Sequence, residues 1–313
     1  MIVEVDAGQT HARVRVAGAH RLQTVDGPGM AINLAQPSAV DLVAAALESA
    51  VRRLIGEGQA VVDDLRIGLS GFDVASGGER ARSVAARVGA CLGARRVTVS
   101  TDDVMWYRAT LGSSAGVLVA VGTGTVVLAA REDGDWKRVD GYGSLLGDDG
   151  SGFDIGRAGL RSALMHWDGR GGSEALLTAA TVRFGPPAGI PAAVYRLASP
   201  TTAVAAFAAD VMGAAAAGDP VAAGIVTSAA EALARSCAAA ATILPTDGEP
   251  PVIACQGGLF ANTDTLWLRF QESLASAAQG MVPERRAADP LDGAPDAETV
   301  GRFPGLVVGW RAD

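Results

Sequence analysis

The sequence predicts an α/β protein made of two duplicated halves, each a mixed sheet with helices, that flank a cleft. Two observations predict this fold class. A three-strand meander with a glycine in its first turn occurs twice, once from residue 1 and again near residue 115. After each meander the chain continues into helices and further strands, which is the element order of mixed α/β sheets.

The first half opens with three short strands, in which polar and apolar residues alternate. Helices with apolar residues at helical spacing then alternate with two more strands. The predicted segments are, in order, the strands IVEVDAG, THARVRVAG and HRLQTV, the helix 38–56, the strand DLRIGLSG, the helix ERARSVAARVGACLG, the strand RRVTVSTDD and the helix DVMWYRATL. We expect this domain to cover residues 1–112 and to be completed by a C-terminal helix at about 298–313.

The second half repeats the meander and then becomes mostly helical. The predicted segments are two apolar strands in AGVLVAVGTGTVVLAA, a more polar strand in DWKRVDGYG, the acidic segment GSLLGDDGSGFDIG, helices over about 172–243, the strand EPPVIACQGG and the helix NTDTLWLRFQESLASAAQ. We expect this larger domain, with its helical insertion, to cover residues 113–297.

The composition argues against several classes of protein. With 313 residues, of which 49% are hydrophobic, the chain can bury two cores. The net charge of −8 and the lack of a basic cluster argue against a nucleic-acid partner. Cys91, Cys237 and Cys255 have no metal-ligand spacing, and we expect reduced, buried thiols. The chain opens as a strand rather than a leader, and Asp210 interrupts the alanine-rich stretch 203–217. We therefore expect a cytoplasmic protein without a membrane span.

Two turns that contain glycine and threonine, one in each half, are candidates for phosphate binding. They are Asp6-Ala7-Gly8-Gln9-Thr10, after the first strand, and Gly122-Thr123-Gly124-Thr125, inside the second meander. Glycine lets backbone N–H groups approach an anion, and a carboxylate such as Asp6 suits Mg²⁺. An ordinary hairpin explains each turn equally well. The pair on matching meanders predicts a nucleotide, with its β- and γ-phosphates on separate turns.

Phosphoryl transfer also needs a carboxylate that accepts the proton of the attacking hydroxyl. Asp102 and Asp103 are candidates, because they stand where a buried strand ends and a helix begins. Thr101 or Asp102 could instead cap this helix. Asp103 could equally be a solvated aspartate in the first helical turn, favoured by the helix dipole.

Together these segments resemble the N-acetylglucosamine kinases and related BadF/BadG/BcrA/BcrD-type ATPases of the sugar kinase, Hsp70 and actin superfamily. The resemblance covers nearly the whole chain, and its segments are VDAGQTHARVRV, STDDVMWYRATLG, VAVGTGTVVLAA, GYGSLLGDDGSGFDIG and IACQGGLFAN. The acidic segment is the most specific, since the family pattern is close to GDEGSG, an aromatic residue and Ile-Gly. The resemblance implies two actin-like (ribonuclease H-like) domains, ATP with Mg²⁺, and a homodimer.

The resemblance also implies roles for individual residues. Asp102 matches the catalytic base that takes the proton of the sugar 6-hydroxyl, and Asp6 lies near Mg²⁺. The residues at nucleotide positions are Gly8, Gln9, Thr10, Gly122, Thr123, Gly124, Thr125 and, in the adenosine motif, Gly257 and Gly258. The residues on the sugar side are Asn33, Asp103, Tyr142, Gly143, Asp148 and Asp149.

The chain departs from the family pattern only around the sugar. Asp103 stands where a small residue is usual, Asp149 replaces a glutamate, and the stretch around Asn33 lacks the usual Gly-x-x-Asn. Glucosamine carries an ammonium group at neutral pH, and Asp103 or Asp149, on the buried side, could pair with it. The chain is similar in this to glucosamine kinases. We therefore expect ATP-dependent phosphorylation of glucosamine at its 6-hydroxyl, with N-acetylglucosamine as the alternative.

Two rival classes fit the sequence less well. An ATPase that activates a radical dehydratase needs cysteines that ligate an Fe–S cluster, whereas the three cysteines lie in apolar helices or strands. A sugar-responsive repressor usually carries an added helix-turn-helix, and this chain begins on the first strand of the kinase-like meander.

Overall fold

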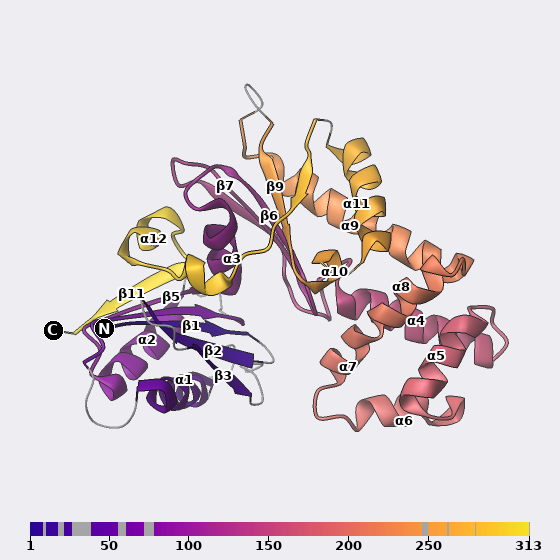
Figure 1. Ribbon diagram of the computed structural model, residues 1–313, viewed down its shortest axis with the longest axis horizontal. Helices are drawn as coiled ribbons and strands as arrows, with labels where there is room; N and C mark the ends of the chain where they lie inside the picture. The colour runs from indigo at the N-terminus through magenta and orange to yellow at the C-terminus, as the bar shows by residue number, and fades with distance from the viewer. Residues whose placement is uncertain are drawn as a thin grey trace. The chain divides into compact units, whose positions relative to one another are not determined.

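The computed structural model describes residues 1–8, 11–17, 22–26, 39–55, 61–71, 78–245, 250–261, 263–278 and 280–312. The chain forms two compact units (Figure 1). Unit 1 comprises Met1–Ser114, Arg131–Trp136 and Ala288–Asp313, and unit 2 comprises Ala115–Ala130 and Lys137–Ala287. Gln9, Thr10 and Asn33, which the sequence analysis assigned to ligands, lie outside the described residues.

Unit 1 contains a six-stranded mixed sheet in the order β11-β5-β4-β1-β2-β3. Its strands are β1 (Ile2–Ala7), β2 (His11–Val16), β3 (Leu22–Asp26), β4 (Asp64–Leu69), β5 (Arg96–Thr101) and β11 (Val307–Arg311). Its α-helices are α1 (Ala39–Ile55), α2 (Glu79–Leu92), α3 (Asp102–Leu111) and α12 (Ala297–Arg302). Apolar side chains of β1, β2, β4, β5, β11, α1 and α2 form one core.

Strands β1, β4 and β5 run parallel to one another, so their carboxyl ends lie at one edge of the sheet. Ala7 pairs with Leu69, and Leu69 pairs with Thr101. The residues that directly follow these strands, which include Ser70 after β4 and Asp102 after β5, are therefore held at this edge of the sheet. In open α/β sheets, ligands bind outside the carboxyl ends of parallel strands.

The prediction of a C-terminal helix at about 298–313 is wrong beyond Arg302. Helix α12 ends at Arg302, and Val307–Arg311 forms strand β11, which pairs antiparallel with β5. Pro304 cannot continue a helix, and Gly305 takes a φ of +85° that turns the chain back. Val307 and Val308 then pack into the unit as β-branched residues of a strand.

Unit 2 contains a five-stranded sheet in the order β10-β9-β6-β7-β8. Its strands are β6 (Gly116–Val121), β7 (Thr125–Ala130), β8 (Trp136–Asp140), β9 (Val252–Gln256) and β10 (Pro283–Arg285). Its α-helices are α4 (Gly152–Trp167), α5 (Glu174–Phe184), α6 (Ile190–Tyr195), α7 (Pro200–Ala206), α8 (Ala208–Ala216), α9 (Pro220–Ala241), α10 (Gly258–Ala261) and α11 (Asp264–Ala277). Helices α5 to α8 gather at one end of the unit (Figure 1).

The two sheets share one strand order. Strands β3-β2-β1-β4-β5 in unit 1 correspond to β8-β7-β6-β9-β10 in unit 2, with a meander followed by two parallel strands. This repetition confirms the predicted α/β fold class with two duplicated mixed-sheet domains. The mostly helical stretch predicted for 172–243 is also confirmed.

None of the helices in the described ranges is by itself long and apolar enough to cross a membrane. The segments Pro200–Ala216 and Pro220–Ala241 reach that length and composition only together, and they are bent by 119° at their junction.

Candidate active site

In unit 1, Asp6 stands near the carboxyl end of β1 and is bonded to an arginine of the neighbouring strand. Arg13, its partner in the β1–β2 register, donates from Nε at 3.2 Å and from Nη2 at 2.7 Å to Asp6 Oδ2. Arg13 also pairs with Asp289 at 3.1 Å. The ion pair therefore fixes the position of the Asp6 carboxylate at the sheet edge, next to Gly8.

Asp6 suits a magnesium ion that a nucleotide carries. Mg²⁺ keeps several waters and usually takes one or two protein carboxylates together with substrate phosphates. Within the described ranges, no three or more His, Cys, Asp or Glu side chains are grouped so that they could hold a metal by themselves. A single carboxylate at the strand end fits a magnesium site that is completed by phosphates and water. It does not fit a site in which protein side chains alone bind the metal.

Asp102 begins α3 directly after β5 and is half-buried. The hydroxyl of Ser70, the first residue after β4, donates a hydrogen bond to Asp102 Oδ2. The backbone N–H of Asp103 donates to Asp102 Oδ1 at 3.1 Å. Thr101 occupies the cap position, and its side chain makes no capping hydrogen bond. Ser70 was not singled out from the sequence, although Ser70 and Asp102 directly follow two strands that are parallel to each other.

Asp103 is fully buried, so the interpretation as a solvated aspartate is wrong. Its Oδ1 accepts the backbone N–H of Val104 at 3.0 Å inside the first turn of α3. Because Asp103 has no exposed surface in this arrangement, a sugar ammonium group could meet it only inside the protein. The contact that the sequence suggested stays a prediction.

Two glycines lie against helix α3. A Cβ atom at Gly68 in β4 would lie 1.7 Å from Met105 Sδ, and one at Gly293 would lie 2.0 Å from the Met105 carbonyl oxygen. The Met105 side chain therefore fills the space over Gly68, and Gly293 approaches the backbone of α3 more closely than a side chain would allow. This packing sets the height of α3, and hence of Asp102, above the sheet. The sequence analysis assigned neither glycine a role.

In unit 2, the turn after β6 and the glycine pair after β9 lie side by side. Strands β6 and β9 are parallel, and Ala120 pairs with Gln256. Gly122 N–H donates to the Gly124 carbonyl at 2.9 Å, which closes the turn. Gly257 has a φ of +104°, and a Cβ there would lie 2.1 Å from the Val121 carbonyl oxygen. The two segments predicted to bind nucleotide thus meet at one edge of this sheet.

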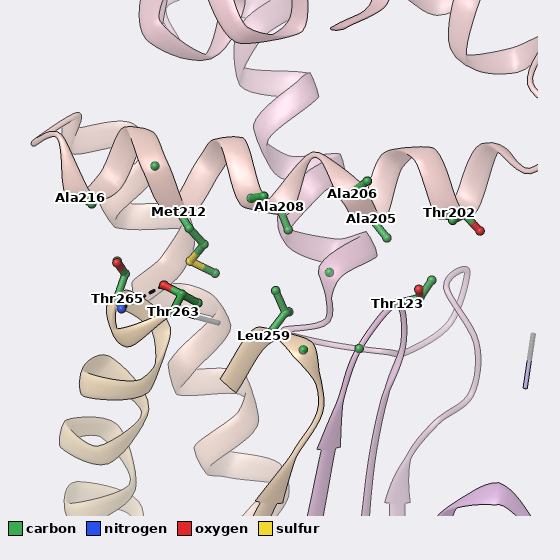
Figure 2. A pocket seen from close by; sticks show the side chains of 15 residues that line it. Thr123, Thr202, Ala205, Ala206, Ala208, Met212, Ala216, Leu259, Thr263 and Thr265 are labelled. Atoms are coloured by element: carbon green, nitrogen blue, oxygen red, sulfur yellow. Dashed lines mark hydrogen bonds between the residues drawn. The ribbon is translucent and has the colours of Figure 1, made fainter. Parts of the chain in front are cut away.

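A cavity of about 610 Å³ opens at this meeting point. Its lining residues are Gly122, Thr123, Gly152, Thr202, Ala205, Ala206, Ala208, Ala209, Met212, Gly213, Ala216, Gly258, Leu259, Thr263 and Thr265. None of these residues carries a charge. Figure 2 shows alanines of α7 and α8 along one wall, with Met212 pointing toward Leu259 and Thr263, and Thr123 at the turn. Such a space, apolar with a few hydroxyls, is typical of small-molecule sites.

Three of the residues predicted to bind nucleotide, Gly122, Thr123 and Gly258, line this cavity. The wall from α7 and α8 was not predicted, because alanines that face a ligand follow the same spacing as alanines that face a core.

The N-terminus of α4 is hydrogen-bonded to the turn after β6. Gly152 N–H donates to the Gly122 carbonyl at 2.8 Å, and Phe153 N–H donates to the Thr123 carbonyl at 3.1 Å.

The acidic segment is organised by Asp140, which the sequence analysis did not name. Its carboxylate accepts three backbone N–H groups, from Gly141 at 2.7 Å, Asp148 at 2.7 Å and Asp149 at 2.9 Å. Asp140 and Asp148 both adopt positive φ values, 63° and 60°. Aspartate tolerates this conformation better than most residues. The loop is therefore held from inside by one buried carboxylate.

Asp148 lies against the turn Gly122-Thr123-Gly124-Thr125. The residue is 8% exposed, and a Cβ at Gly124 would lie 2.8 Å from Asp148 Oδ2. Burial raises the pKa of Asp148 to about 6. The nearby Asp140 charge acts in the same direction, while backbone N–H groups of Thr125 and Gly143 oppose it.

Asp149 and Tyr142 face outward from the same segment. Burial raises the pKa of Asp149, and the charges of Asp140 and Asp154 raise it further. Tyr142 is 68% exposed. These two side chains can reach a ligand at the surface of unit 2, as the sequence analysis expected of sugar-binding residues.

The cysteines provide no cluster site. Cys237 and Cys255 are buried, and burial raises the pKa of both thiols. Cys91 is exposed, so the prediction of three buried thiols is wrong for this residue. It lies on α2 outside the apolar face that contains Val84, Val88 and Leu92.

Comparisons with known proteins agree with these features. Residues 5–294 match the BadF/BadG/BcrA/BcrD ATPase family. An N-acetylmuramic acid/N-acetylglucosamine kinase of Clostridium acetobutylicum is 26% identical over 182 residues, which are 57% of this chain and 59% of that protein. The chain thus matches less than two thirds of the length of this curated relative.

Solved structures share the fold. A candidate N-acetylglucosamine kinase of Chromobacterium violaceum has 24% identity, covers 93% of this chain and 96% of its own, and has a TM-score of 0.64. A candidate N-acetylglucosamine kinase of Porphyromonas gingivalis has 21% identity, covers 94% and 96%, and has a TM-score of 0.68. Since the family match extends over most of the sequence, the resemblance inferred from the motifs is confirmed. The chain belongs to the BadF/BadG/BcrA/BcrD ATPase family.

Proposed function

We propose that this protein is an ATP-dependent sugar kinase that phosphorylates N-acetylglucosamine, or a closely related N-acetylated amino sugar, at its 6-hydroxyl. The observation that carries the proposal is the cavity of unit 2, which is lined by Gly122, Thr123 and Gly258. These residues come from two glycine-rich segments that follow parallel strands, an arrangement suited to a nucleotide. Membership of an ATPase family and the kinases among the relatives support the same function.

A nucleotide needs an apolar surface for its base and polar groups for its phosphates, and this cavity offers both. The apolar wall from α7 and α8 can cover the faces of a purine base. The turn at Gly122 to Gly124 brings backbone close to phosphate without an intervening side chain. Because the net charge is −8 and the lining carries no cation, phosphate binding would depend on backbone N–H groups and Mg²⁺.

Asp102 of unit 1 would act as the general base. It accepts the proton of the sugar 6-hydroxyl while the hydroxyl oxygen forms a bond to the γ-phosphorus. The bond from the γ-phosphorus to the bridging oxygen breaks, and ADP leaves. Positioning and charge stabilisation supply most of the rate enhancement in such reactions. A bound Mg²⁺, near Asp6, would neutralise charge on the β- and γ-phosphates.

The choice between the two amino sugars follows from two observations, and it reverses the order that the sequence suggested. The curated relative acts on N-acetylated sugars by name, and the two solved neighbours are candidate N-acetylglucosamine kinases. Of the two carboxylates that could pair with the ammonium group of glucosamine, Asp103 is fully buried, and only Asp149 is exposed. Glucosamine is the second candidate, because Asp149 is exposed and lies near the charges of Asp140 and Asp154, where a cation would be stabilised.

A coupled ADP-release assay with ATP and Mg²⁺ tests the proposal. N-acetylglucosamine, glucosamine and glucose are compared, and mass spectrometry identifies the phosphorylated product. Highest kcat/KM with N-acetylglucosamine is the expected result. A preference for glucosamine that is lost in Asp149→Asn would favour the second candidate, and ADP release that ignores added sugar would refute the kinase assignment. The homodimer expected from the family resemblance stays a prediction, which sedimentation velocity can test.

A further inference from the structure

We infer that Ser70 is a positioning residue that holds the Asp102 carboxylate in the orientation required for proton transfer. This inference rests on the proposed function, in which Asp102 is the base. Ser70 lies outside the motifs that carry the family resemblance. Its assignment comes from the hydrogen bond that its hydroxyl donates to Asp102 Oδ2.

The backbone of Ser70 is fixed on two sides. Leu69 pairs with Ala7 of β1 and with Thr101 of β5, so residues 70 and 102 leave neighbouring parallel strands at the same height. The Ser70 N–H also donates to the Ala7 carbonyl at 2.9 Å. Ser70 is 6% exposed. The donor therefore belongs to the rigid edge of the sheet and not to a loop.

Asp102, in contrast, is half-buried and needs such a restraint. A half-exposed aspartate at a helix start can rotate about its side-chain bonds, and only some orientations aim a lone pair at the sugar hydroxyl. The Ser70 hydroxyl and the Asp103 N–H bind different oxygens of the carboxylate, which restricts this rotation. A carboxylate has about four lone-pair sites, so these two hydrogen bonds do not by themselves prevent it from accepting a proton.

Serine also suits a base better than a charged donor would. A lysine or arginine at this position would stabilise the carboxylate strongly and weaken it as a proton acceptor. A neutral hydroxyl gives orientation with a smaller effect on basicity. It can also rotate, so that it accepts a hydrogen bond once the carboxyl group has taken the proton.

The test compares Ser70→Ala, Ser70→Thr and a matched control in the full-length enzyme. Ser100→Ala is the control, because Ser100 is also buried in unit 1 and its hydroxyl bonds to the Thr101 carbonyl instead of a carboxylate. For Ser70→Ala we expect kcat to fall about tenfold or more, the loss typical of one orienting hydrogen bond to a charged group. The KM for ATP and the Kd for a non-hydrolysable ATP analogue should stay within about twofold, and Ser70→Thr should restore most of kcat.

The outcomes separate the two claims. Unchanged kcat in Ser70→Ala, or an equal loss in Ser100→Ala, would overturn the positioning role while the kinase assignment stands. A failure of Ser70→Thr to recover activity, in a protein that still binds nucleotide normally, would also overturn it. Absence of sugar-dependent turnover in the unmodified enzyme would overturn the proposed function and the role of Ser70 with it.

Discussion

The glycine beneath helix α3 gives a prediction that links packing to catalysis. In Gly68→Ala, the new Cβ would lie 1.7 Å from Met105 Sδ and 2.6 Å from Met105 Cγ, and Met105 has no exposed surface into which it could move. Gly293 also meets the backbone of α3 at Met105 and Ala109, which restrains the helix. Overpacking of this kind costs about 1–3 kcal/mol. Because Met105 is a flexible side chain with no free surface, we expect about 2 kcal/mol.

Hydrogen exchange of the α3 amides measures this cost within unit 1, without assuming that both units unfold together. A loss of about 2 kcal/mol corresponds to about thirtyfold less protection. Because Asp102 is the first residue of α3, a shift of the helix should also lower kcat by about tenfold or more. Gly301→Ala is the control, since nothing lies within 4 Å of a Cβ at that position in α12.

A double variant tests the cause. Met105→Ala removes the Sδ and Cγ atoms that the new methyl group would meet, so Gly68→Ala should cost much less in that background. Equal cost with and without the Met105 side chain would refute the steric argument. Wild-type protection and kcat in Gly68→Ala would refute the idea that this packing positions Asp102.

Three further predictions concern unit 2. In Gly257→Ala, the new Cβ would lie 2.1 Å from the Val121 carbonyl oxygen at a residue whose φ is +104°, so the affinity for an ATP analogue, measured by calorimetry, should fall at least about tenfold. Gly189→Ala is the control, since nothing lies within 4 Å of a Cβ there, and it should bind the analogue normally. Ala209→Trp places a ring in the cavity from an exposed position on α8, so nucleotide affinity should fall while the fold, followed by circular dichroism, persists. Because burial raises the pKa of Asp148 from 3.8 to about 6, its protonated form favours folding. The contribution of Asp148 to the free energy of unfolding should be full below pH 4 and be lost, by at most about 3 kcal/mol, as the pH rises from about 4 to 6; the difference between the wild type and Asp148→Asn in urea titrations at several pH values measures it.

The features that the sequence predicted well are those that depend on neighbouring residues in the chain. Alternation in the two meanders, with Gly8 shortly after Asp6 and Gly122 directly after Val121, marks strands and turns by local chemistry. The position of Asp102 directly after a buried strand is likewise a local signal, and its role as the base stays a prediction. The stop at Pro304 and Gly305 was also local, and a closer use of the proline rule predicts the end of α12 there.

The features that the sequence could not predict depend on distant segments. The bond from Ser70 to Asp102 exists because β4 and β5 pair in one register, and no local pattern fixes that register. The role of Gly68 depends on how closely α3 packs on β4. Asp103 stands in the first turn of a helix, as many surface aspartates do, yet its side chain is fully buried, and no local pattern predicts that burial.

The central claim of the proposed function is that the protein transfers the γ-phosphoryl group of ATP to a sugar hydroxyl, and that Asp102 accepts the proton of that hydroxyl. The most direct measurement is sugar-dependent ADP release by the unmodified enzyme and by Asp102→Asn, with calorimetric binding of an ATP analogue to both. We predict turnover with N-acetylglucosamine that falls by at least about a hundredfold in Asp102→Asn while nucleotide affinity is retained. Turnover in Asp102→Asn close to that of the unmodified enzyme would contradict the claim.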